Sequence, residues 1–165
     1  MDEIGQIWKS PAQADHLKMK RLIIAPHHTV EENGIVQYST FVKNAYFWLY
    51  LAQKYQDKIT FIFKPHPNLR DKTIQARFFH SFEEYDAYLE MWNALPNAKV
   101  VEEESYLDIF ATSDGMIMDS ASFIGEYLYV NKPLLFLTRE EQRFNSLGEK
   151  ILPCYYAAKG ENYIA

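Results

Sequence analysis

The sequence predicts a three-layer α/β fold in which a doubly wound parallel sheet lies between two layers of helices. Short runs rich in β-branched and aromatic residues alternate along the chain with segments of helical periodicity, which is the pattern of strands and helices in such folds. The first run, RLIIAP at 21–26, is continuously apolar, as in a strand that is buried on both faces. The commonest order of six strands in this fold is 3-2-1-4-5-6, so the first and fourth strands are expected to be neighbours.

Five further runs complete the expected sheet. The strands are expected at 21–26, 58–63, 98–101, 116–118, 134–137 and 154–158, the last of them at an edge. The second run, KITFIF, stops at KPHPN, because two prolines cannot occupy a central strand. The proline-rich loop has a restricted backbone and is expected to hold His66 in a fixed direction.

Two long helices are predicted between the strands. Ser39 or Thr40 can cap a helix that runs to about Tyr55. Ser81 and Glu84 have the spacing of a capping box for the second helix. The buried faces expected from the periodicity are Phe41, Ala45, Trp48, Leu49 and Ala52 in the first helix, and Phe82, Tyr85, Leu89 and Trp92 in the second.

Residues 113–138 are expected to form a short strand, a polar elbow, a helix and another strand. The elbow consists of Asp119, Ser120, Ala121 and Ser122, and the helix after it would bury Ala121, Ile124 and Leu128. The first N–H groups of a helix have no intrahelical partner and carry a positive partial charge, so a phosphate could bind there. Simple capping of the helix by a serine or aspartate is the alternative explanation of the same residues.

Length and composition indicate one domain of a reducing compartment. A chain of 165 residues buries about two-thirds of the surface that its extended form exposes, so its core can stabilise the fold without a disulfide or a structural metal. Residues 1–20 have no sustained hydrophobic period and are expected to be a linker, which leaves 21–165 as the domain. Within the domain, one short helix is expected over 106–111, and another is expected to end near Gly148. Cys154 is the only cysteine, and no run of 18 to 20 apolar residues is present, so a soluble, cytoplasmic protein is expected. The net charge of −5 argues against nucleic acid as a partner.

Polar residues follow several of the predicted strands at one edge of the sheet. In open α/β sheets the ligand binds in the crevice at the carboxyl ends of the strands. The residues expected there are His27, His28, Thr29, Lys64, His66, Asn68, Asp119, Ser120, Ala121, Ser122, Thr138 and Arg139. Imidazoles, an ammonium group and hydroxyls suit a phosphorylated ligand. The missing GxGxxG and GxxxxGK[ST] motifs argue against a dinucleotide redox cofactor and against a nucleoside triphosphatase.

His27, His28 and Glu126 each have two competing interpretations. Alternation in an extended loop would send only one residue of the pair His27 and His28 toward the crevice, and His28 is favoured. Glu126, beyond the elbow, could accept hydrogen bonds from ribose hydroxyls or be an ordinary surface carboxylate.

Three segments resemble one protein family. APHHT after the first strand, FKPHPNL after the second and SDGMIMDSASFIGEY…KPLLFL later in the chain are similar to the C-terminal half of the CDP-glycerol glycerophosphotransferase family. These are teichoic-acid and capsular polysaccharide polymerases of the GT-B type, and the similarity spans about 20–150. This sequence departs from the family at Ser120, where an aromatic residue is common, and at His27 and His28, which replace a more usual Thr-Trp pair.

The resemblance implies a two-domain enzyme whose C-terminal, Rossmann-like domain binds an activated donor while an N-terminal domain presents the acceptor. His66 would contact the donor diphosphate, Ser120 and Ser122 would hold phosphate, and Glu126 would meet the ribose. Together with the crevice residues this gives His66 and His28 as catalytic candidates. Lys64, Asn68, Asp119, Ser120, Ala121 and Ser122 are the phosphate-binding candidates, Glu126 and Thr138 the nucleoside-binding ones, and His27, Thr29 and Arg139 further ones.

The expected activity is transfer of glycerol phosphate, or of a related polyol phosphate or sugar, from a CDP- or UDP-linked donor to a cell-surface polymer. The full-length enzyme would work at the inner face of the plasma membrane. Positioned imidazole and ammonium donors would replace a divalent cation, so no cofactor and no protein-bound metal are expected. One alternative is a metal-dependent phosphohydrolase in which His28, His66 and Asp119 bind Zn²⁺ or Mn²⁺, although no HxH or HxxxH spacing supports it. The other is a nucleotide-binding module without catalysis.

Overall fold

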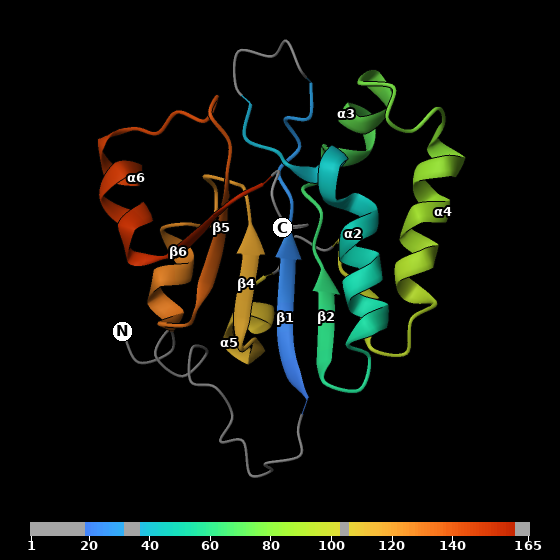
Figure 1. The fold of residues 1–165 in the computed structure, drawn as a ribbon, viewed down its shortest axis with the longest axis horizontal. Coiled ribbons are helices and arrows are strands. Elements are labelled where there is room, and N and C mark those ends of the chain that lie inside the picture. The colour runs from blue at the N-terminus through green and yellow to red at the C-terminus, as the bar shows by residue number, and fades with distance from the viewer. Residues whose placement is uncertain (1–18, 32–36, 103–105, 161–165) are drawn as a thin grey trace.

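The sheet has six parallel strands in the predicted order. The computed structural model describes residues 19–31, 37–102 and 106–160 (Figure 1). The strands are β1 (Lys20–Ala25), β2 (Ile59–Phe63), β3 (Ala98–Val100), β4 (Gly115–Met118), β5 (Leu134–Thr138) and β6 (Tyr156–Lys159). They lie in the order β3-β2-β1-β4-β5-β6, and every neighbouring pair is parallel. The predicted three-layer fold and the adjacency of the first and fourth strands are confirmed.

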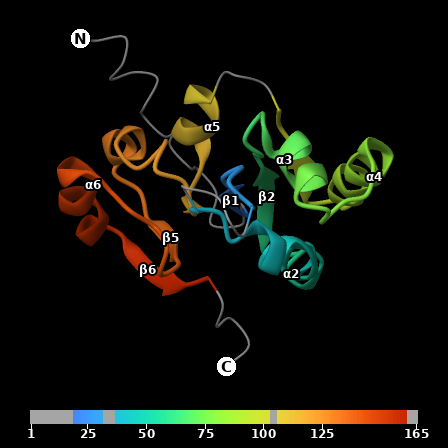
Figure 2. The ribbon, with the colours of Figure 1, turned by 90° about the horizontal axis from the view of Figure 1, so that it is seen from above.

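Helices cover both faces of the sheet. They are α2 (Phe41–Lys54), α3 (Leu69–Gln75), α4 (Phe82–Asn93), α5 (Leu107–Thr112) and α6 (Ser146–Ile151), with 3₁₀ helices η1 (Glu126–Val130) and η2 (Leu152–Cys154). Figure 2 shows α2 on one face of the sheet and α5 on the other. None of the helices in these described ranges is long and apolar enough to cross a lipid bilayer.

Side-chain alternation along the strands divides the core in two. In β2, Phe61 and Phe63 pack with α2 and α4, while Ile62 faces the opposite side. Trp92 of α4 stacks on Phe63 with the ring centroids 4.9 Å apart. The five residues predicted to form the buried face of α2 are all buried, and the predicted cap of α4 is present, because the Glu84 N–H donates to Ser81 Oγ.

Four details differ from the sequence-based expectation. Phe82 was expected to be buried, but its side chain is 47% exposed and lies under the Arg70 guanidinium, 4.4 Å from the ring centroid. The loop KPHPN was predicted, but the short helix α3 that begins directly after it was not. Gly148 lies inside α6 rather than at its end. Residues 1–18 of the predicted linker lie outside the described residues. Its last residue, Lys20, belongs to β1.

The elbow after β4 does not begin an α-helix, so that part of the prediction is wrong. Residues 119–125 are irregular, and only the 3₁₀ helix η1 follows. The Ser122 N–H donates to Ser120 Oγ at 3.0 Å, a local bond of the kind that competes with helical hydrogen bonding. Ile124 is buried as expected, whereas Leu128 is exposed. The argument for phosphate binding at a helix dipole therefore loses its basis, and any anion at the elbow would have to be held by other groups.

Candidate functional site

Backbone pairing between β1 and β2 continues beyond the strands and brings two histidine-containing loops together. The Lys64 N–H donates to the Ile24 carbonyl at 2.8 Å, and the His66 N–H points to the Pro26 carbonyl at 3.4 Å. Parallel neighbours therefore remain in register for three more residues. His66 arrives beside His27 for this reason, although the two lie far apart in the sequence.

Three imidazole rings form a cluster at the carboxyl ends of β1 and β2. The ring centroids are 4.2 Å apart for His27 and His28, 4.0 Å for His28 and His66, and 5.4 Å for His27 and His66. His27 is buried, and the other two rings are half-buried. Both His27 and His28 contact His66, because the chain bends at His28 instead of continuing as an extended strand.

A hydrogen bond fixes which ring nitrogen of His66 carries the proton. The Asn68 N–H donates to Nδ1 of His66 at 3.1 Å, so the neutral ring carries its proton on Nε2. Nδ1 of His27 lies 2.9 Å from Thr29 Oγ1. Nδ1 of His28 is buried and has no hydrogen-bond partner among the described residues.

Burial favours the uncharged form of all three imidazoles. Burial, followed by the charges of His28 and His66, lowers the pKa of His27 to about 3. Burial is also the largest cause that lowers the pKa of His28, with His66 and Lys72 adding to it. Burial lowers the pKa of His66 as well. The cluster therefore offers N–H groups and lone pairs rather than fixed positive charge.

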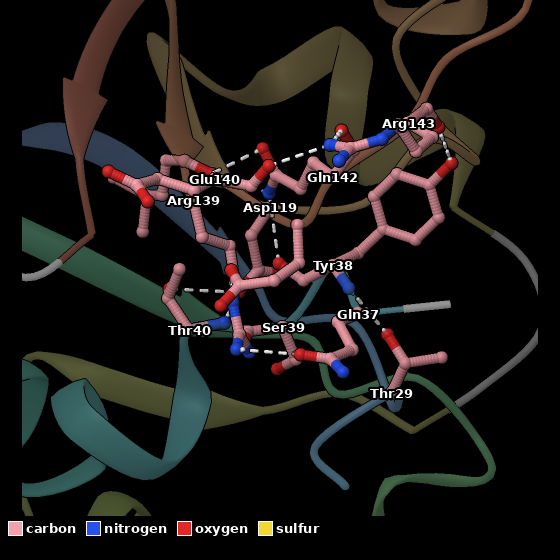
Figure 3. A network of polar contacts seen from close by, with 12 residues as sticks. Thr29, Gln37, Tyr38, Ser39, Thr40, Asp119, Arg139, Glu140, Gln142 and Arg143 are labelled. Carbon is pink, nitrogen blue, oxygen red and sulfur yellow. Dashed lines mark hydrogen bonds and ion pairs between the residues drawn. The ribbon is translucent and has the colours of Figure 1, made fainter. Parts of the chain in front are cut away.

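Asp119 holds the β1 loop and the start of α2 together from the end of β4. Its carboxylate accepts the His27 N–H at 2.6 Å. It also accepts the Thr40 hydroxyl at 2.9 Å and the Thr40 N–H (Figure 3). Burial raises the pKa of Asp119 to about 6, and these hydrogen bonds oppose the rise. Asp119 was expected to help bind a donor phosphate, but the structure places its carboxylate oxygens on Thr40 and on the His27 backbone.

The segment before α2 is held by a second set of contacts, also visible in Figure 3. Arg139 donates to the Ser39 carbonyl at 2.8 Å and to Gln37 Oε1 at 3.1 Å. Gln142 donates to the Tyr38 carbonyl at 2.9 Å, and the Tyr38 N–H donates to Thr29 Oγ1 at 2.9 Å. We call Asp119, Thr40, Gln37–Ser39, Arg139 and Gln142 the clamp.

A cavity of about 230 Å³ lies between the KPHP loop and the elbow. Its walls are Ala25, Pro26, Lys64, Pro65, His66, Pro67, Tyr106, Ser120, Ser122 and Phe123. The lining includes a lysine and a histidine from the KPHP loop, two serines from the elbow, and the aromatic residues Tyr106 and Phe123. These groups can donate to the oxygens of an anionic ligand.

A larger groove of about 720 Å³ adjoins the cavity at Ser122, which lines both. It runs between the elbow with η1 and the segment leading into α6, and its walls include Ala121, Gly125, Glu126, Tyr38 and Phe144. Glu126 Oε1 accepts the Tyr106 hydroxyl at 3.1 Å, whereas Oε2 is buried without a partner among the described residues. The groove is mostly apolar, with a carboxylate at one side.

The structure gathers some of the candidate residues and separates others. Those around the cavity and the groove are His66, Lys64, Ser120, Ala121, Ser122 and Glu126. His27 and His28 contact His66 in the cluster but line neither the cavity nor the groove. Those engaged elsewhere are Asp119 and Arg139 in the clamp, Thr29 beside His27, Thr138, whose hydroxyl donates to the Ala158 carbonyl, and Asn68, which is exposed at the start of α3.

Tyr106 lines the cavity but was not among the sequence candidates. Burial, with the Glu126 carboxylate, raises the pKa of its hydroxyl, and its ring lies 5.0 Å from that of Phe123. The residue precedes α5, on the opposite face of the sheet from α2, and its position in the sequence resembles a helix start. Its contact with Glu126 depends on how α5 packs against η1, and no local pattern signals such packing.

The comparisons with known proteins identify the fold. No protein-family model matches the sequence, and no curated protein matches it. Among solved structures, the UDP-GlcNAc 2-epimerase of Methanocaldococcus jannaschii, in complex with UDP-GlcNAc and UDP, is 13% identical with a TM-score of 0.54, over 97% of this chain and 38% of that one. The α,α-trehalose-phosphate synthase (UDP-forming) of Burkholderia xenovorans is 13% identical with a TM-score of 0.52, over 98% of this chain and 39% of that one.

A structure of the wall teichoic acid polymerase TagF is 15% identical with a TM-score of 0.44, over 97% of this chain and 33% of that one. At that score the similarity supports no inference about this chain. The first two comparisons support a Rossmann-like α/β fold. The chain spans about two-fifths of the length of those two enzymes.

Proposed function

We propose that this chain is the donor-binding domain of a transferase that moves glycerol phosphate, or a related polyol phosphate or sugar, from a CDP- or UDP-linked donor to a cell-surface polymer. The observation that carries the proposal is the meeting of the KPHP loop and the DSAS elbow around one cavity. These are the two segments on which the resemblance to the CDP-glycerol glycerophosphotransferase family depends. Another domain would present the acceptor, at the inner face of the plasma membrane.

The cavity and the groove suit two parts of such a donor. The diphosphate would lie between His66, Lys64 and the serine hydroxyls, and the nucleoside would occupy the adjoining groove with its ribose near Glu126. Carboxylates accept hydrogen bonds from hydroxyl groups, and Glu126 Oε2 has no partner in the described structure. One epimerase of similar fold was crystallised with UDP-GlcNAc and UDP, which makes nucleotide diphosphates the first ligands to test.

The proposed chemistry is stabilisation of a leaving phosphate. When the bond between the transferred group and the nucleotide breaks, negative charge grows on the phosphate oxygens that leave. The Nε2–H of His66 can donate to such an oxygen, because Nδ1 already accepts the Asn68 N–H. One well-aimed donor of this kind lowers the barrier by about 3 kcal/mol. The transfer proposed in this form needs no protein-bound metal and no cofactor.

Calorimetric titration of the chelator-treated chain with CDP-glycerol, CDP-ribitol, UDP-GlcNAc, CDP and UDP tests the proposal. We expect at least one to bind, and His66→Ala to weaken that binding at least about tenfold. His80→Ala is the matched control, because His80 is exposed and lies outside the cluster. Absence of binding by all five ligands, or equal affinity in the His66→Ala variant, would contradict the proposal. Binding by a full-length protein that transfers nothing would identify a non-catalytic nucleotide-binding module instead.

A further inference from the structure

The cluster of His27, His28 and His66 has the composition of a metal site that sequence spacing does not show. One nitrogen from each ring lies within 4.8 Å of the corresponding nitrogens of the other two. Zinc ligands at bond lengths of about 2.0 Å lie about 3.3 Å from one another in a tetrahedral site. The three nitrogens would therefore have to move together by at most about 1.5 Å, which is within the range of side-chain rotation for two half-buried rings.

We infer that these three histidines form a binding site for one Zn²⁺ ion. Three neutral imidazoles without a carboxylate suit a borderline transition metal, whereas Mg²⁺ and Ca²⁺ prefer oxygen ligands. Three protein ligands leave the fourth tetrahedral position for water or another small ligand. His28 and His66 are half-buried and give an ion access from solvent, while buried His27 forms the base of the site.

The Nδ1 atoms of His28 and His27 bear on this site. Nδ1 of His28 is buried and unpartnered among the described residues, so an ion bound there would remove an unfavourable state. Thr29 Oγ1 lies 2.9 Å from Nδ1 of His27 and can orient that ring, as outer-shell partners commonly do for metal-binding histidines.

His66 has to exchange one hydrogen bond for a metal bond. The Asn68 N–H donates to its Nδ1, which leaves the proton on Nε2. Coordination through Nε2 moves the proton to Nδ1 and ends the bond from Asn68. A ring that ligates zinc in this way cannot donate the same Nε2–H to a phosphate, so zinc and the proposed nucleotide donor exclude one another at His66.

The zinc site is tested without nucleotide, so its failure is separate from failure of the proposed function. The chain is stripped with a chelator and titrated with ZnCl₂ by calorimetry, and with CoCl₂ by visible absorption, where intense d–d bands indicate tetrahedral coordination. We expect one ion per chain. His28→Gln and His66→Gln should each weaken zinc binding at least about tenfold, and excess MgCl₂ should not compete.

Two control variants keep the result specific. His80→Gln removes an exposed histidine outside the cluster, and His16→Gln removes one that lies outside the described residues. Both should bind zinc as tightly as the unmodified chain, and circular dichroism should show that every variant is folded. Substoichiometric binding, unchanged binding in His28→Gln and His66→Gln, or loss of binding in either control would overturn the inference.

Discussion

Two polar regions meet at His27, and they differ in how completely their hydrogen bonds are satisfied. In the clamp, the Asp119 carboxylate accepts three hydrogen bonds, and Arg139 and Gln142 donate to groups of the segment before α2. In the region of the cluster, cavity and groove, Nδ1 of His28 and Oε2 of Glu126 are buried without partners in the described residues. Both regions are built from loops at the same edge of the sheet, where the strands have their carboxyl ends.

This difference separates structural residues from candidate ligand-binding residues. A buried polar group that is satisfied within the protein stabilises the fold, whereas one left without a partner costs free energy until a ligand or an ion satisfies it. The clamp keeps the β1 loop in place, and the side chains of the cluster depend on the position of that loop. Substitutions in the clamp should therefore change stability, and substitutions around the cavity should change binding.

The largest expected effect on stability is that of Asp119→Ala. The variant leaves the buried N–H groups of His27 and Thr40 and the Thr40 hydroxyl without their acceptor, so the free energy of unfolding should fall by about 3 to 4 kcal/mol. Urea denaturation measures this loss. Asp57→Ala, at an exposed turn residue, is the control and should change stability by less than about 0.5 kcal/mol. A loss below about 1 kcal/mol for Asp119→Ala would remove the distinction between the regions.

Acidification should destabilise the chain through His27. The pKa of His27 is lowered to about 3 in the folded state, so between that pH and about 6.5 the unfolded chain binds one proton more. Stability is fully present above pH 6.5 and is lost as pH falls, by at most about 1.4 kcal/mol per pH unit. Asp119, whose pKa is raised to about 6, opposes this loss below that pH.

Comparison with His27→Gln isolates the histidine contribution. Urea midpoints measured from pH 7 to pH 4 with a chelator present should fall less steeply in the variant, which has no imidazole to protonate. Equal slopes in the two proteins would mean that His27 titrates alike in the folded and unfolded states.

A smaller effect is expected for Thr138→Val. The Thr138 hydroxyl donates to the Ala158 carbonyl at 3.2 Å and joins β5 to the edge strand β6. Loss of this neutral hydrogen bond should cost about 1 kcal/mol, as measured by thermal or urea unfolding. Thr138→Ser keeps the hydroxyl and should retain most of that stability. If nucleotide affinity falls in Thr138→Val while stability is unchanged, Thr138 belongs to the binding region after all.

The smallest effect on stability is expected for Glu126→Gln. The amide keeps the Oε1 acceptor for Tyr106, and the unpartnered Oε2 becomes an NH₂ group, so unfolding should change by less than about 0.5 kcal/mol. If the ribose of a nucleotide lies at this side chain, affinity should nevertheless fall at least about tenfold, because a charged acceptor is replaced by a donor. Glu90→Gln on the exposed face of α4 is the control for both measurements.

Much of the fold follows from local patterns in the sequence. Continuous apolar runs such as 21–26 and 58–63 identify strands that are buried on both faces, and period 3.6 with a capping serine identifies α4. The alternation of these elements was sufficient to predict the strand order. It was also sufficient to place Lys64, His66, Ser120 and Ser122 at one edge of the sheet, where they now line one cavity.

Local patterns failed where competing local bonds or distant contacts determine the conformation. The apolar spacing after Asp119 resembles a helix, but the hydrogen bond between Ser120 and Ser122 accompanies an irregular elbow instead. Asp119 looked like a phosphate-site residue because its position at the strand end is right. Its acceptors are occupied by donors 92 and 79 positions away, which no window of sequence contains.

By itself, the sequence determined which segments are strands and helices and which edge of the sheet collects the polar residues, because these depend on periodicity and on the end of each strand. The tertiary structure alone decided that His27, His28 and His66 share one cluster and that Asp119 and Arg139 hold the loop before α2. The physical reason is register: the pairing of β1 with β2 and β4 brings together side chains that lie far apart in the chain. A shift of one residue in that pairing would turn the side chains of the shifted strand to the other face of the sheet and displace the loop that follows it.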